Sequence, residues 1–250
     1  METRNITVPE TAEYIEGLYH QRNDYLKSLR EKSDAAMVPI LLGETEPLLQ
    51  QLIMLRKPKN ILEIGTAVGY GAICFATWAP EAKITTIEYS ADMVEQALQN
   101  IQDAGFADRI TVREGDAREV LAALYEERGE EGEPYDFIFI DAGKGHYLEF
   151  WSLSLPMMAK DCIVASDNVL FKGLTCSDVF EAPGKKKRKH RTIVRRLRKY
   201  LDYLSHQDGL VTAVLAVGDG LAITTVEDPE LVKSQWNLEK IMENEQHEHE

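Results

Sequence analysis

The sequence predicts an α/β fold in which helices cover both faces of a mostly parallel sheet. From residue 60 onward, short apolar segments alternate with stretches of helical periodicity, as they do in a doubly wound sheet. Glycines follow the first apolar segment, at the point where a strand would turn into a helix. The last two apolar segments are separated only by Gly218-Asp219-Gly220, which is too short for a crossover and therefore predicts an antiparallel hairpin.

The first 56 residues predict a helical extension. An apolar stripe at three- and four-residue spacing runs from Tyr14 to Leu29, which indicates an amphipathic helix. A second helix is expected to begin around Thr45, since Pro47 is tolerated in a first turn, and to continue through Leu55.

The main domain is expected over residues 57–228. Its strands are expected at residues 61–64, 84–88, 110–113, 137–141, 162–166, 210–217 and 221–226. Between the second and third strands, a helix is expected to be capped by Ser90 and to end near Gly105. Residues 169–187 show no clear period, which is typical of a functional or mobile connection. Residues 229–250 are expected to form an acidic tail.

Composition limits the class of protein. Of the 250 residues, 44% are hydrophobic, which is enough for an ordinary core. No apolar run approaches the roughly 20 residues that cross a bilayer, so no membrane association is expected. The three cysteines have no CxxC spacing, which disfavours a disulfide framework and a structural zinc site. We therefore expect a cytoplasmic protein.

The basic residues are unevenly placed. The net charge is −14, yet residues 185–199 hold ten of the 28 Lys and Arg residues and no acid. A basic segment within an acidic chain favours a polyanionic partner.

The first three strand ends indicate a nucleotide site. The segment ILEIGTAVGYG carries Glu63, Gly65 and Gly69 at a strand-to-helix turn, and Glu88 ends the next strand, where a carboxylate can accept both ribose hydroxyls. The glycine spacing is not that of a pyrophosphate-binding turn, and Glu63 would repel a pyrophosphate but attract an ammonium group. The pattern therefore favours S-adenosylmethionine (SAM) over NAD. Asp116, after the third strand, is placed to meet the adenine amino group.

The fourth and fifth strand ends indicate a metal site. Asp141, Asp167 and Asn168 offer two carboxylates and an amide oxygen, a hard ligand set that suits Mg²⁺ or Mn²⁺. Lys144 lies three residues after Asp141, so a nearby cation would lower its pKa and fit it to act as general base. The alternatives are a turn or helix cap for Asp-Asn and an exposed surface position for the lysine.

The segments LEIGTAVGYG, TIE, GDA, IDAGKGHY and SDN, in this order, resemble the class I, metal-dependent catechol-type O-methyltransferases over about residues 35–226. The resemblance implies a Rossmann-like SAM-binding sheet of seven strands with the last one antiparallel. It implies metal ligation by Asp141, Asp167 and Asn168, with Lys144 and Asp141 in the catalytic set. It implies cofactor contacts from Val38, Glu63, Gly65, Tyr70, Gly71, Glu88, Asp116, Ala117 and Asp141. Many relatives have a serine where this chain has Gly71. The sequence therefore does not fix how tightly the methionyl carboxylate of SAM is bound.

The basic segment bears on the substrate. Ile193, Leu197 and Leu204 belong to an apolar helical stripe, preceded by KKKRK in an expected loop, and the arginines fall largely off that stripe. A solvated face or a membrane-surface helix would show the same pattern. Because the segment follows the expected metal site, a phosphate-rich substrate fits better. RNA contacts are expected from Lys189, Arg191, Arg195 and Arg198.

Two substrates fit this description. The favoured one is 5-hydroxyuridine in tRNA, because the sequence is similar to the bacterial tRNA 5-hydroxyuridine methyltransferases. The alternative is a small catechol or a phenolic coenzyme A ester, and a non-catalytic RNA-binding protein on the same fold is a remote third. The N-terminal helix and the family resemblance also suggest a homodimer.

Overall fold

A computed structural model describes residues 9–129, 132–176 and 185–237, with the backbone alone for Pro9, Ala12 and residues 185–189. Within these residues the strands form one seven-stranded sheet in the order β3-β2-β1-β4-β5-β7-β6. The strands are β1 (Asn60–Ile64), β2 (Lys83–Glu88), β3 (Ile110–Glu114), β4 (Tyr135–Ile140), β5 (Met158–Ser166), β6 (Leu210–Leu215) and β7 (Leu221–Val226). The first five strands are parallel, and β7 pairs antiparallel with both β5 and β6. The expected fold class is confirmed.

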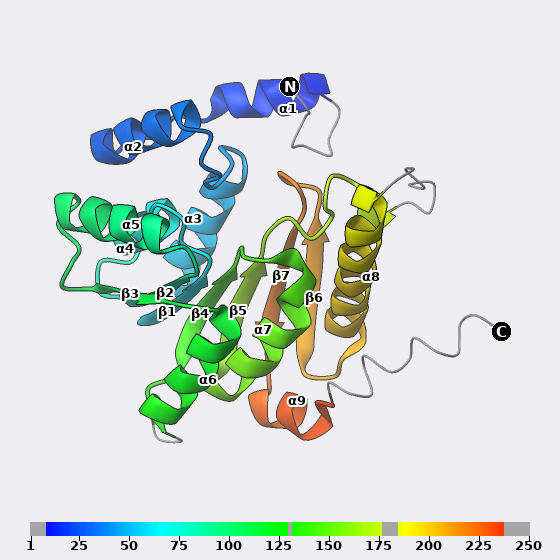
Figure 1. Ribbon diagram of the computed structural model, residues 1–250. Coiled ribbons are helices and arrows are strands. Elements are labelled where there is room, and N and C mark those ends of the chain that lie inside the picture. The colour runs from blue at the N-terminus through cyan, green and yellow to red at the C-terminus, as the bar shows by residue number, and fades with distance from the viewer. Residues whose placement is uncertain (1–8, 130–131, 177–184, 238–250) are drawn as a thin grey trace.

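Helices cover both faces of the sheet (Figure 1). The helices are α1 (Pro9–Leu18), α2 (Asp24–Ala35), α3 (Thr45–Arg56), α4 (Tyr70–Trp78), α5 (Ala91–Asp103), α6 (Ala117–Arg128), α7 (Tyr147–Ser154), α8 (Lys185–His206) and α9 (Pro229–Gln235). The described residues also contain the short 3₁₀ turns η1 (Lys144–His146), η2 (Leu155–Met157) and η3 (Leu174–Cys176).

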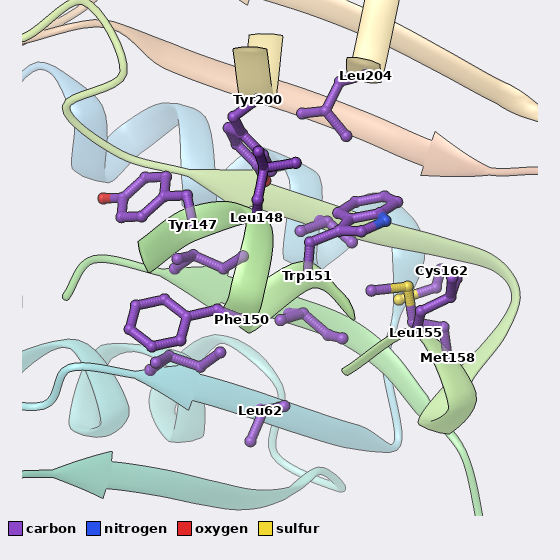
Figure 2. Packing of buried hydrophobic residues seen from close by; sticks show 14 of the residues in the cluster. Leu62, Tyr147, Leu148, Phe150, Trp151, Leu155, Met158, Cys162, Tyr200 and Leu204 are labelled. Carbon is purple, nitrogen blue, oxygen red and sulfur yellow. The ribbon is translucent and has the colours of Figure 1, made fainter. Parts of the chain in front are cut away.

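The two faces of the sheet bury separate cores. Leu62 and Ile64 of β1 pack into a core with α6, α7 and α8, whereas Ile61 packs into a second core with α2 to α5. Because β1 is buried on both faces, its sequence after Asn60 is a continuous apolar run apart from Glu63. In the first core the rings of Tyr147 and Tyr200 meet edge to face, with centroids 5.6 Å apart (Figure 2).

Two helices, α1 and α2, replace the single helix that was expected from Tyr14 to Leu29. The chain breaks between α1 and α2, because the Asn23 side chain accepts the Leu26 amide and caps a new helix. Leu26 and Leu29 lie in the second core, so α2 belongs to the body of the protein. On α1, Tyr14 and Leu18 are exposed. The expected homodimer remains a prediction.

The C-terminal region is also more ordered than a solvated tail. Residues 229–235 form α9, capped by Asp228, and buried Val232 anchors it. Trp236 packs edge to face on Tyr203 and donates its indole N–H to the Ser152 hydroxyl at 2.9 Å. Residues 238–250 lie outside the described part of the chain. In that described part, none of the helices combines the length and apolar character needed to span a membrane.

Candidate active site

The expected site residues come together in one cleft of about 900 Å³ at the carboxyl ends of the parallel strands. This is the edge where ligands bind in doubly wound sheets. Twelve residues expected from the sequence line it: Val38, Glu63, Gly65, Tyr70, Gly71, Glu88, Asp116, Ala117, Asp141, Lys144, Asp167 and Asn168.

The turn after β1 requires glycine. Gly65 has a φ of +99°, and a Cβ there would lie 2.5 Å from the carbonyl oxygen of Asp141. A Cβ on Gly71 would lie 2.2 Å from Oε1 of Glu63. The absence of side chains therefore lets β1 and β4 approach closely and leaves Glu63 its position beneath the start of α4.

Glu63 is 1% exposed, and its Oε2 accepts the hydroxyls of Thr66 and Thr86, each at 2.5 Å. Burial raises the pKa of this carboxyl to about 7, although both hydroxyl donors act in the opposite direction. A cationic group bound in the cleft would favour the ionised form. The position is thus suited to the ammonium expected from the sequence.

Glu88 is held rigidly at the end of β2. Its Oε2 accepts the amide of Ala67 and its Oε1 accepts the amide of Ser90, both at 2.9 Å. Each carboxylate oxygen keeps a further lone pair for a ligand hydroxyl. The two amides therefore orient an acceptor toward the cleft.

Replacing Glu88 by Gln should weaken SAM binding by about 1–2 kcal/mol, roughly tenfold, because one acceptor oxygen becomes a donor. Isothermal titration with SAM measures this loss. Glu95→Gln, an exposed change on α5, should bind SAM as the wild-type protein does. Equal SAM affinity in all three proteins would contradict the ribose-binding role of Glu88.

Asp116 combines two structural roles. Its Oδ1 accepts the Arg118 amide at 2.9 Å and caps α6, and its Oδ2 lies 2.6 Å from Nη2 of Arg118. The hydrogen bonds from Arg118 hold the pKa of Asp116 at about 2. Asp116 lines the cleft as expected, but its oxygens already serve the helix cap and the ion pair.

The Tyr70 hydroxyl belongs to a polar network with the N-terminal helices. It donates to Glu46 Oε2 at 2.8 Å and accepts from Arg30 Nε at 3.2 Å. Arg30 pairs with Glu46 at 2.7 Å, and Gln21 donates to the other oxygen of Glu46 at 2.5 Å. This network ties α2 and α3 to the start of α4, beside the glycine turn. No local sequence pattern links these positions, so the network could not be predicted from the sequence.

The expected metal-site residues converge on one side of the cleft. Lys144 Nζ donates to Asn168 Oδ1 at 2.7 Å and lies 4.0 Å from Asp141 Oδ1. Asp167 is 2% exposed, and its Oδ1 accepts the Asn168 amide at 2.7 Å. Burial raises the pKa of Asp141 to about 6, and burial together with the Asp141 charge raises the pKa of Asp167.

The donor set fits a hard divalent cation. The buried carboxylate of Asp167 and the half-buried carboxylate of Asp141 repel each other, and with an amide oxygen they form an all-oxygen site in which a cation would favour both ionised forms. Over the described ranges, no group of three or more His, Cys, Asp or Glu side chains is placed to hold a metal ion.

The structure adds two residues on this side. Asp219 is 7% exposed and lines the same cleft as Asp141 and Asp167, and its charge contributes to the raised pKa values of both. The Tyr147 hydroxyl donates to the Asp167 carbonyl oxygen at 2.7 Å and so fixes the end of β5. The Gly-Asp-Gly turn was the only sequence signal for Asp219, and it is equally typical of an ordinary hairpin.

Helix α8 lies beside the cleft. The prediction that KKKRK forms a loop is wrong, because α8 begins at Lys185 and includes this segment. The side chain of Lys189 lies outside the described residues. Arg191, Arg195 and Arg198 are exposed, whereas Leu197 and Leu204 of the expected stripe are buried, as is Tyr200.

Two contacts join α8 to the site. Arg196 Nη1 donates to the Gly145 carbonyl, next to Lys144, at 2.8 Å. The His190 ring meets the cleft residue Phe171 edge to face, with centroids 5.5 Å apart. The cationic helix thus borders the side of the cleft that contains the expected metal-site residues, hereafter the metal side.

Comparison with known proteins agrees with this site. A family model described as O-methyltransferase matches residues 18–226. A catechol O-methyltransferase of Niastella koreensis is 33% identical over 163 residues, covering 64% of this chain and 72% of that protein. Caffeoyl-CoA O-methyltransferase 1 of Eucalyptus globulus is 30% identical over 209 residues, covering 82% and 83%. The SAH-bound structure of the methyltransferase PaMTH1 from Podospora anserina is 27% identical with a TM-score of 0.74, covering 89% of this chain and 97% of that one. The chain therefore belongs to the O-methyltransferase family and is a SAM-dependent enzyme.

Proposed function

We propose that the enzyme methylates a hydroxyl that stands next to a second oxygen, as in a catechol or a phenolic coenzyme A ester, with the help of a divalent metal. The observation that carries the proposal is the convergence of Asp141, Asp167 and Asn168 with Lys144 in the cofactor cleft. The names of the Niastella and Eucalyptus relatives support this substrate class.

The cleft residues have separate roles in cofactor binding, metal binding and proton transfer. SAM supplies an electrophilic methyl group, and a divalent cation held by Asp141, Asp167 and Asn168 would favour ionisation of the substrate hydroxyl. Glu88 and Glu63 hold the cofactor by its ribose and its ammonium. Lys144 Nζ, which lies among the acceptor oxygens, takes the hydroxyl proton. Holding both reactants in one cleft supplies much of the acceleration.

Incubation with SAM, Mg²⁺ and caffeic acid or its coenzyme A ester should yield a methoxy product, detected by mass spectrometry. A phenol with a single hydroxyl is the matched control and should not react, because it lacks the neighbouring oxygen. Methylation of that phenol at the same rate, with excess EDTA present, would refute the proposal.

A second candidate is 5-hydroxyuridine in tRNA, whose O4 and O5 are neighbouring oxygens. The observation that favours it is the exposure of Arg191 and Arg195 on α8, which borders the metal side of the cleft. A basic surface beside the site suits the phosphates of an RNA, and it would also suit those of coenzyme A. Residues 185–199 carry more positive charge than one coenzyme A requires.

A further inference from the structure

Asp219, at the tip of the β6–β7 hairpin, has no part in the proposed function. Aspartate in such a turn is ordinarily exposed, but this one is 7% exposed and lines the cleft that contains Asp141 and Asp167. Its burial shows that the hairpin tip is packed against the metal side of the site.

The tip is bonded to the segment that follows the expected metal ligands. The Asp219 side chain accepts the backbone amide of Lys172. The Asp219 carbonyl accepts the Leu170 amide at 3.1 Å, and the Gly220 carbonyl accepts the Val169 amide at 3.0 Å. Three hydrogen bonds therefore fix residues 169–172 to the hairpin.

Close approach at the tip depends on glycine. Gly220 has a φ of +89°, and a Cβ there would lie 2.4 Å from Cγ of Leu170. Gly218 has a φ of +59°, and its Cβ would lie 2.7 Å from Oγ1 of Thr45 at the start of α3. The tip is thus packed between α3 and the segment after β5, with no room for a side chain at either glycine.

The segment held by the tip has an unfavourable backbone. Asn168, Phe171 and Lys172 all have positive φ values, of 57°, 44° and 58°. Such conformations persist in non-glycine residues only when the surrounding structure imposes them. The hydrogen bond from the Lys172 amide to Asp219 is one of the contacts that impose them here.

The charge of Asp219 acts on the same groups. It contributes to the raised pKa values of Asp141 and Asp167. Burial raises the pKa of Asp219 itself, although its hydrogen bond from the Lys172 amide and the charges of Lys144 and Lys172 act in the opposite direction. Asp219 therefore adds negative charge to the place where the proposed cation would lie, in addition to its bond with the segment.

We infer that Asp219 is a positioning residue of the metal site. Its side-chain acceptor holds residues 168–172 in the conformation in which Asp167 and Asn168 face Asp141, and its carboxylate charge increases the attraction of the pocket for a divalent cation. This role rests on the proposed metal dependence. Partners behind the ligands commonly change metal affinity roughly 10- to 100-fold.

Mn²⁺ binding to the full-length protein without substrate, measured by electron paramagnetic resonance, tests the inference. Asp219→Ala removes acceptor and charge, and should weaken Mn²⁺ binding by up to about 100-fold. Asp219→Asn keeps an acceptor oxygen for Lys172 and should weaken it by about tenfold. Both variants should keep the wild-type affinity for SAM. Asp208→Asn removes one negative charge at an exposed position and should bind Mn²⁺ as the wild type does.

The outcomes distinguish the role of Asp219 from the proposed metal-dependent function. If Asp219→Ala does not fold, Asp219→Asn alone decides, and wild-type Mn²⁺ affinity in it overturns the inference. Equal losses in the two variants overturn the positioning role, and a parallel loss of SAM affinity shows a general structural effect instead. A wild-type protein that binds no Mn²⁺ removes the proposed function, and this role with it.

Discussion

Asp167→Asn is expected to reduce methyl transfer by about three orders of magnitude while leaving SAM binding nearly intact. Asp167 is buried and contributes one of the two carboxylates of the proposed metal site. A cation at such a site stabilises the charge that develops in the transition state by several kcal/mol. Each 1.36 kcal/mol of barrier height changes the rate tenfold. The rate with a catechol measures the first effect and calorimetry with SAM measures the second.

The same strand supplies the control. Asp161 of β5 is exposed and already has a φ of +59°, which asparagine tolerates well. Asp161→Asn should therefore keep full activity. In the wild-type enzyme, excess EDTA should abolish turnover and Mg²⁺ or Mn²⁺ should restore it. Full turnover with excess EDTA, or in Asp167→Asn, would exclude the proposed mechanism.

The sheet could be predicted because its strands are buried on both faces. Ile61 and Leu62 pack into opposite cores, so β1 is apolar at successive positions and stands out from the helices around it. The strand ends were predictable for a related reason, since a parallel sheet brings its carboxyl ends to one edge. Glu63, Glu88, Asp141 and the Asp167-Asn168 pair could thus be assigned to one cleft without knowledge of the packing.

Features that depend on distant contacts could not be predicted. The Tyr70 hydroxyl meets Arg30 and Glu46 across 40 and 24 residues. Gly218-Asp219-Gly220 is locally an ordinary turn, and only its packing against residues 169–172 brings Asp219 to the cleft. The docking of Trp236 on Tyr203 likewise joins α9 to α8.

The substrate can be tested through α8. Replacing Arg191 and Arg195 by Gln should weaken binding of tRNA by about 100-fold or more, because a hydrogen bond to a charged group contributes about 1.5–3 kcal/mol. Arg196 and Arg198 should be kept, since they bond the Gly145 and Thr175 carbonyls and support the fold near Lys144. The salt dependence of tRNA binding, as the slope of log K against log salt, should fall by about 0.7–0.9 for each phosphate that the variant no longer neutralises.

The comparison of substrates decides what the cationic face recognises. The Arg191/Arg195 double variant should methylate a small catechol as the wild type does, because Asp141, Lys144 and Asp167 are unchanged. Lys59→Gln with Lys83→Gln removes two exposed charges outside the cleft and should leave tRNA binding unaltered. If catechol methylation fell together with tRNA binding, α8 would be a structural support of the site. If wild-type and variant proteins bound tRNA equally and only a coenzyme A ester lost activity, the arginines would bind the phosphates of that ester, and the acceptor would be a phenolic thioester.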